Sequence, residues 1–197
     1  MITPGMITPG MITLTLDDGR ALGVVPVEPH EAMTIAEGCR DLSGIRAWWR
    51  MALAASAIRS IDGIPMPMPT HERHIEGLIA RFSRQDMKRI IEVAEQPMSQ
   101  PAPELELVEL TALETLRIWA VIGTFETIAA WVAPAFIAGQ VRAIDGERLI
   151  FPSSKQEMKE IVRRLGLAGM EKASAFLLAK QESDKVESAG RQAAAKN

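Results

Sequence analysis

Tyrosine is absent from this chain of 197 residues, and aromatic side chains make up only 5% of it. Cysteine occurs once, as Cys39, so no disulfide can form within the chain and a reducing compartment is expected. The net charge is −3, and lysine and arginine are scattered, so the sequence lacks the basic face that nucleic-acid binding requires. No basic and apolar targeting segment with a small-residue cleavage site opens the chain, which favours a cytoplasmic location.

Motifs that carry chemistry are also missing. The sequence contains no GxSxG, P-loop, GxGxxG or paired CxxC motif. His71 and His74 flank Glu72 but are one residue too close for the metalloprotease helix, and Cys39 has no base near it in the sequence. We therefore expect no catalytic, metal-binding or cofactor-binding residues, and no enzymatic activity.

What the sequence does contain is an internal repeat. When the chain is shifted by 83 positions without a gap, the segment Arg59 to Gly63 falls on Arg142 to Gly146 and keeps its Arg, Ile, Asp and Gly. Further identities extend from Leu22/Leu105 to Met87/Met170, including Glu31/Glu114 and Trp48/Trp131. Self-similarity at a fixed period indicates a repeated structural unit, so the chain is a tandem duplication.

The repeat predicts the domain organisation. Pro- and Gly-rich or polar stretches should separate two modules. We expect a flexible leader over residues 1–10, a first module over 11–95, a proline-rich linker over 96–103, a second module over 104–180 and a flexible tail over 181–197.

Periodicity and turn residues predict mainly helical modules with short strands, an α+β class. Asp18-Gly19 marks a hairpin turn between extended segments 12–16 and 21–27. Each module should read strand, helix, helix, turn, helix, helix. The helices are expected near 30–42, 45–60, 70–82 and 86–95, and then near 112–122, 127–143, 157–165 and 167–180, with the second module's strand at 105–110.

One stretch could instead cross a membrane. Residues 118–141 carry a single charge, at Glu126, and are long enough to span a bilayer. The matching stretch of the first module is rich in charged side chains and could not span lipid cheaply. A buried pair of central helices is therefore expected, and a membrane-associated protein is the more remote alternative.

Matched and unmatched residues suggest different roles. Asp62-Gly63 and Asp145-Gly146 have the composition of structural turns, because glycine allows positive φ and aspartate binds nearby backbone amides. The matched tryptophans Trp48 and Trp131 are expected to be core anchors. Candidates for partner contact are the unmatched Trp49 and the adaptable methionines Met66 and Met68.

Two segments of the first module, ITLTLDDGRALGVVPVEP and RSIDGIPMPMP, lie in an order that resembles small phage tail assembly chaperones. The resemblance covers residues 11–95 and concerns layout. It implies a non-enzymatic, mostly helical protein of the host cell cytoplasm that binds an apolar tail protein such as the tape measure and leaves before the virion is complete.

The same features leave an alternative open, a structural virion or scaffold component in which the modules stay permanently packed. In either case the expected partner is a protein, and a homo-oligomer is compatible with the duplication. No nucleic-acid partner and no cofactor is expected, and a membrane partner is disfavoured.

Overall fold

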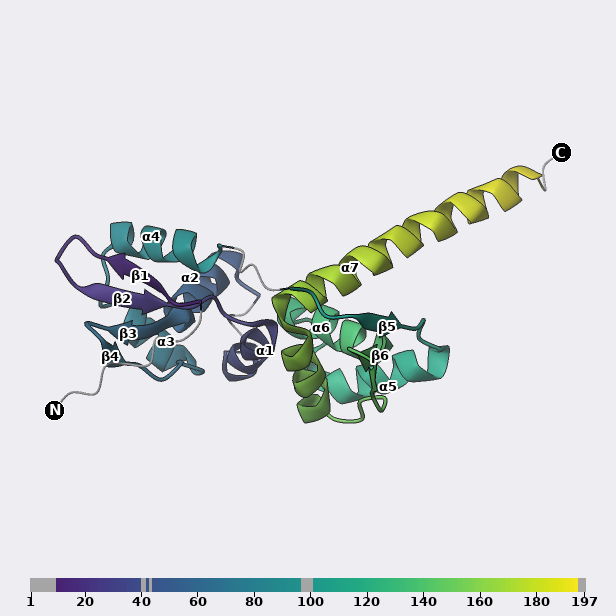
Figure 1. Cartoon of the computed structure of the whole chain (residues 1–197), viewed down its shortest axis with the longest axis horizontal. Coiled ribbons are helices and arrows are strands. Elements are labelled where there is room, and N and C mark those ends of the chain that lie inside the picture. Colours follow the sequence, from purple (N-terminus) through teal and green to yellow (C-terminus); the bar gives the residue numbers. More distant parts are fainter. Residues whose placement is uncertain (1–9, 40–41, 43, 97–100, 195–197) are drawn as a thin grey trace. The chain divides into compact units, whose positions relative to one another are not determined.

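The computed structural model describes residues 10–39, 42, 44–96 and 101–194, with side chains described as far as Lys180 (Figure 1). The chain divides into two compact units, each of which is described by itself. The first unit comprises Met1–Ser99 together with Ile122–Ala133, and the second comprises Gln100–Val121 together with Pro134–Asn197.

The first unit contains an antiparallel sheet with the order β1 (Ile12–Thr15), β2 (Ala21–Val24), β3 (Ile58–Ile61) and β4 (Ile64–Pro65). The β1–β2 hairpin closes through the Leu16 amide, which donates to the Arg20 carbonyl at 2.9 Å, and Gly19 supplies a positive φ of 86°. The Asp18-Gly19 turn of the sequence therefore joins two paired strands.

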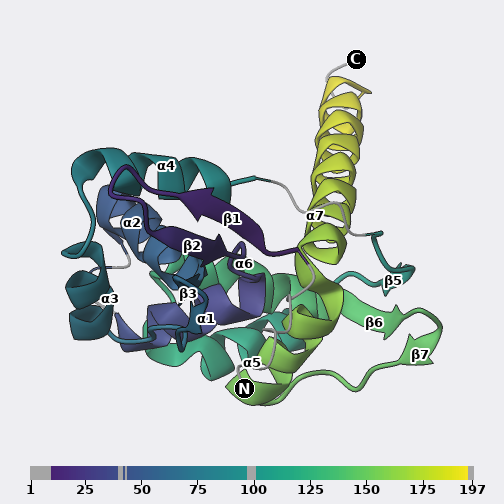
Figure 2. The same ribbon diagram turned by 60° about the vertical axis from the view of Figure 1, so that its left-hand side comes forward.

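The helices of the first unit are α1 (Pro29–Gly38), α2 (Arg46–Ala57), α3 (Glu72–Ile79) and α4 (Arg84–Ala94). Helix α4 lies along β1 and β2 (Figure 2), where the Arg89 guanidinium donates to the Thr15 carbonyl at 2.7 Å. Aliphatic side chains from the strands and from α2, α3 and α4 fill the core, among them Leu22, Val24, Ala55, Ile58, Ile75 and Ile90, all of which are fully buried.

The rest of the chain repeats this order of elements. It contains β5 (Leu105–Leu107), α5 (Ala112–Ile122), a 3-10 turn (Gly123–Phe125), α6 (Ala129–Gln140), β6 (Val141–Ile144), β7 (Glu147–Arg148) and α7 (Lys155–Ala194). Strands β5, β6 and β7 form a second antiparallel sheet in that order. The fold is thus mixed α+β with mainly helix, as the sequence predicts.

The 83-residue offset holds at the level of single contacts. Leu22 lies opposite Ile61 in the first sheet, and Leu105 lies opposite Ile144 in the second. A β-bulge follows at Gly23/Val24 in β2 and at Glu106/Leu107 in β5. The two sheets are therefore built on the same register.

The predicted second helix of each module is too long. The segment 45–60 contains α2 only as far as Ala57, after which the chain turns extended at Ile58 and forms β3. The segment 127–143 likewise holds α6 as far as Gln140 and then β6. Apolar residues such as Ile58 and Ile61 continue the helical spacing, so periodicity alone cannot locate a helix that passes directly into a strand.

The predicted flexible tail also differs from the structure, because α7 continues through residues 181–194 to Ala194. Alanine, lysine and glutamate favour helix even without an apolar face. A break between two predicted helices is present at Gly166, which has a φ of 58° and stands 83 residues after Ser83, the N-cap of α4. Residues 1–9 of the predicted leader and 97–100 of the predicted linker lie outside the described residues.

Candidate protein-binding surfaces

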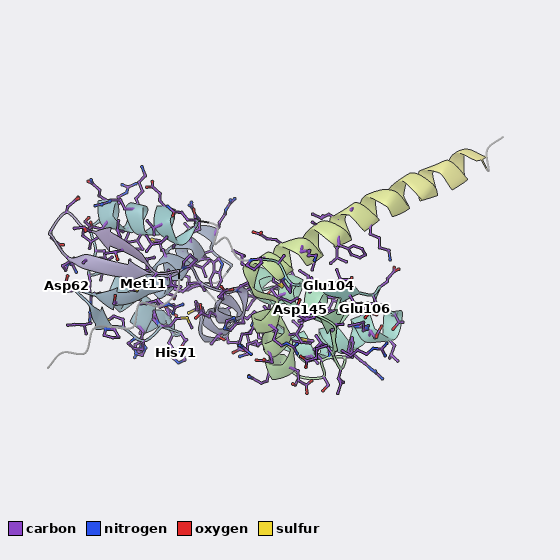
Figure 3. All side chains as sticks on the ribbon, in the orientation of Figure 1. Met11, Asp62, His71, Glu104, Glu106 and Asp145 are labelled. Carbon is purple, nitrogen blue, oxygen red and sulfur yellow. The ribbon has the colours of Figure 1, made fainter. Side chains whose placement is uncertain are left out.

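The Asp-Gly turns join neighbouring strands in both sheets. Asp62 and Asp145 have φ values of 52° and 50°, in the left-handed region that aspartate tolerates better than most residues. Asp62 Oδ1 accepts the Ala21 amide at 2.8 Å, and Asp145 Oδ1 accepts the Glu104 amide at 2.8 Å (Figure 3). Each carboxylate is thus already bound to the strand next to its own turn.

A second repeated contact ties the first helix of each module to its sheet. The Arg59 guanidinium binds the Glu31 carboxylate at 2.7 Å, and Arg142 binds Glu114 at 2.8 Å. Glu114 also accepts the Thr111 amide at 2.9 Å, which is the capping contact at the start of α5. These side chains are part of the framework that both modules share.

The tryptophans and methionines predicted as anchors or contacts lie at different depths. Trp131 is fully buried, and its indole Nε1–H donates to the Met33 carbonyl at 3.0 Å within the first unit. Trp48, Trp49, Met66 and Met68 are half-buried and pack against the core of the first unit. The matched tryptophans therefore occupy different environments, and Trp49 is no more exposed in class than Trp48.

The histidines and the cysteine do not assemble a site. The rings of His71 and His74 lie 6.1 Å apart, edge to face. Burial raises the pKa of the Cys39 thiol to about 11, and the nearby carboxylates Glu72 and Glu76 act in the same direction. Within the described part of the chain, no cluster of three or more His, Cys, Asp or Glu side chains is arranged to hold a metal ion.

Exposed apolar side chains gather mainly on the second unit. Large hydrophobic residues exposed there are Val108, Leu113, Leu116, Trp119, Ile150, Phe176 and Leu178. The Trp119 ring contacts Phe136 edge to face, with ring centres 5.0 Å apart, so this indole is held in place although it is 38% exposed. Residues 118–141 are therefore not uniformly buried, in contrast to the predicted pair of buried central helices. Clustered apolar exposure is typical of protein-binding surfaces.

Strand β5 has an open edge. In the first sheet β2 lies between β1 and β3, whereas β5 pairs with β6 alone among the described residues. Glu104 directs its amide and carbonyl to Asp145, on the β6 side. Since successive backbone groups of a strand point to opposite sides, the amide and carbonyl of Leu105 point to the open edge.

An open groove lies beside the end of β5. It has a volume of about 260 Å³ and is lined by Glu109, Leu110, Thr115, Phe136, Gln140, Phe176, Leu177 and Lys180. The Lys180 ammonium and the Glu109 carboxylate pair at 2.7 Å, and this bond lowers the pKa of Glu109. The corresponding hollow of the first unit, lined by Val27, Leu53 and Ala94 among others, measures about 80 Å³.

The sequence carries signals for these surfaces that the analysis of matched residues overlooks. Residues 95–98 stand where β1 would repeat, and Pro97 among them lacks the amide that a central ladder needs. Trp119 stands where the first module has Ala36, so a large side chain replaces a small one on the first helix. Differences between the two modules, more than identities, mark the open surfaces.

Within the residues that the structure describes, no helix combines the length and apolarity needed to cross a membrane. Comparisons with protein-family models, with curated proteins and with solved structures found no match.

Proposed function

We propose that this chain is a non-enzymatic assembly factor that holds an extended segment of another protein on the open edge of β5. The observation that carries the proposal is the missing strand of the second sheet. An edge with unpaired amides and carbonyls is a template for an added strand, which gains affinity from main-chain hydrogen bonds.

The first unit supplies a template for the bound segment. There β1 pairs antiparallel with β2, with Ile12 opposite Val24 and Leu14 opposite Leu22, and both β2 residues are fully buried. The matching residues Leu107 and Leu105 of β5 are only half-buried. A segment with aliphatic side chains at alternate positions would complete their burial in the way that β1 does for Leu22 and Val24.

Two further features narrow the partner. Glu106 is exposed on β5, where the first module has Gly23, so a lysine or arginine in the added strand would face an opposite charge. The groove at Leu110 and Phe136 lies next along the chain and has room for a large apolar side chain of the same segment. The proposed ligand is thus an extended, alternately aliphatic segment with a basic residue.

The resemblance to tail assembly chaperones supplies the class of protein. Under the proposal the chain acts in the host cell cytoplasm on an apolar tail protein such as the tape measure. The alternative, a structural virion or scaffold component, would use the same edge for a permanent contact. Presence of the chain in purified particles would favour this alternative, and its absence would favour the chaperone.

A proline substitution tests the open edge. Leu105→Pro removes an amide that points away from β6, so the sheet should remain intact while an added strand loses a hydrogen bond and meets the ring. After co-expression with the neighbouring gene products, affinity capture and mass spectrometry should recover a tail protein with the wild-type chain. Capture by Leu105→Pro should fall roughly tenfold or more.

Leu105→Val is the matched control, because it keeps the amide and an aliphatic side chain at the same position, and it should capture the partner as the wild-type chain does. Circular dichroism checks that both variants fold. Equal capture by Leu105→Pro and Leu105→Val, or recovery of no tail protein by the wild-type chain, would contradict the proposal.

A further inference from the structure

The first helices of the two modules differ in what covers them. On α1, Met33 and Ala36 are fully buried, and the Met33 carbonyl accepts the Trp131 indole N–H at 3.0 Å. Trp131 belongs to Ile122–Ala133, the segment that joins the first unit. Its ring lies 5.5 Å from that of Phe125, and both side chains are at most 2% exposed. This face of α1 is therefore covered within the first unit.

The matching face of α5 is open. Leu116 stands 83 residues after Met33 and is 65% exposed, and Trp119 stands 83 residues after Ala36 and is 38% exposed. Leu113 lies one turn earlier and is 58% exposed. These three side chains recur every third residue and so share one side of the helix. We call them the α5 face.

The segment that would match the cover is open as well. Phe125, Ile128 and Trp131 correspond to Leu42, Ile45 and Trp48 of the first module. Ile128 is 7% exposed, whereas Ile45 is 52% exposed, and Leu42 and Trp48 are half-buried. We call Leu42, Ile45 and Trp48 the docking segment. Each half of the contact made inside the first unit thus has a matching half whose apolar residues remain accessible.

We infer that the docking segment of a second copy of this chain binds the α5 face. The contact would repeat, shifted by 83 residues on both sides, the one that Ile122–Ala133 already makes with α1. Leu42, Ile45 and Trp48 then take the places of Phe125, Ile128 and Trp131 against Leu116 and Trp119. The Trp48 indole N–H donates to the Leu116 carbonyl, as Trp131 donates to Met33.

The two halves of this contact lie on different surfaces of the chain, so the contact is head-to-tail. A head-to-tail contact leaves a free α5 face at one end and a free docking segment at the other, and it continues as a ring or a filament. The inference goes beyond the proposed function, because the outer edge of β5 takes no part in the contact.

Paired substitutions test the head-to-tail contact. Leu116→Asp places a charge on the α5 face, and Ile45→Asp places one on the docking segment. Both positions are more than half exposed, so each variant should fold. Sedimentation velocity of the wild-type chain over a wide concentration range should show species larger than a dimer. Each variant alone should stay a monomer at concentrations roughly tenfold above those at which the wild-type chain associates.

The mixture of the two variants is the decisive sample. The intact α5 face of Ile45→Asp can bind the intact docking segment of Leu116→Asp, and the complex then has no further working surface. An equal mixture should form a dimer and nothing larger. Ile150→Asp, at a position 91% exposed and away from both surfaces, is the matched control and should associate like the wild-type chain.

Conservative changes keep the test informative if an aspartate variant fails to fold. Trp48→Phe keeps an aromatic ring but removes the indole donor, and it should weaken association roughly fivefold. Leu105→Pro should leave association unchanged, which separates this inference from strand addition at β5. A monomeric wild-type chain, association of Ile45→Asp alone, or a mixture that stays monomeric would each overturn the inference.

Discussion

At the scale of single residues, the two aspartates of the Asp-Gly turns have the most exacting positions. Each lies at positive φ, and each binds the neighbouring strand twice, through its amide and through Oδ1. For Asp62 these bonds reach Ala21 at 2.7 and 2.8 Å. A residue here must tolerate the left-handed region and also present an acceptor, and few side chains do both.

Substitutions at Asp62 should separate the two requirements. Asp62→Ala loses the acceptor and places a Cβ-bearing residue without a compensating bond at positive φ, so the free energy of unfolding should fall by about 1–3 kcal/mol. Asp62→Asn keeps an oxygen acceptor and tolerance of positive φ, and it should cost less. The same order is expected at Asp145. Urea unfolding of each variant measures the change, and an equal loss for Ala and Asn would show that the negative charge matters most.

At the scale of elements, the sequence predicts most of the framework. The hairpin at Asp18-Gly19, helix α5 with its bounds Ala112–Ile122, and the break at residue 166 all follow from local turn and capping signals. Strands β3 and β6 could not be predicted in this way, because each continues directly from a helix and becomes a strand by pairing with β2 or β5. Pairing is decided by distant residues, which local periodicity does not contain.

The start of α5 should respond to pH through Glu114. Hydrogen bonds from the Thr111 amide and hydroxyl lower the pKa of Glu114 below its ordinary value of 4.5, and the charge of Arg142 adds to this. A pKa lowered in the folded state means that the ionised carboxylate stabilises the fold above pH 4.5. This stabilisation is lost as the pH falls through the lower folded-state pKa.

Glu114→Gln removes the ionisable group and tests this dependence. Thermal unfolding should give a lower Tm for Glu114→Gln than for the wild-type chain at neutral pH, and the difference should shrink as the pH falls below 4.5. Glu31→Gln is the variant at the repeat-equivalent position and reports on the same ion pair with arginine in the first module. A Tm difference for Glu114→Gln that stays constant with pH would contradict the assignment.

At the scale of the whole molecule, duplication has kept the framework and changed what covers it. The first module has β1 along β2, and the second has an open β5 edge. Met33 is buried on α1, and its match Leu116 is exposed on α5. The sequence could not predict these open surfaces from apolar residues alone, because Leu105 and Leu116 have the composition of core positions. Exposure depends on which other segment packs against them.

Amide exchange at Leu105 tests the central claim, that the open edge of β5 binds a partner strand, most directly. Exchange of backbone amides should be compared for the chain alone and for its complex with the captured tail protein. We predict that the Leu22 amide, covered by β1, is protected in both samples, and that the Leu105 amide exchanges rapidly in the free chain and becomes protected in the complex. A Leu105 amide that exchanges equally fast in both samples, or that is already protected in the free chain, would contradict the account.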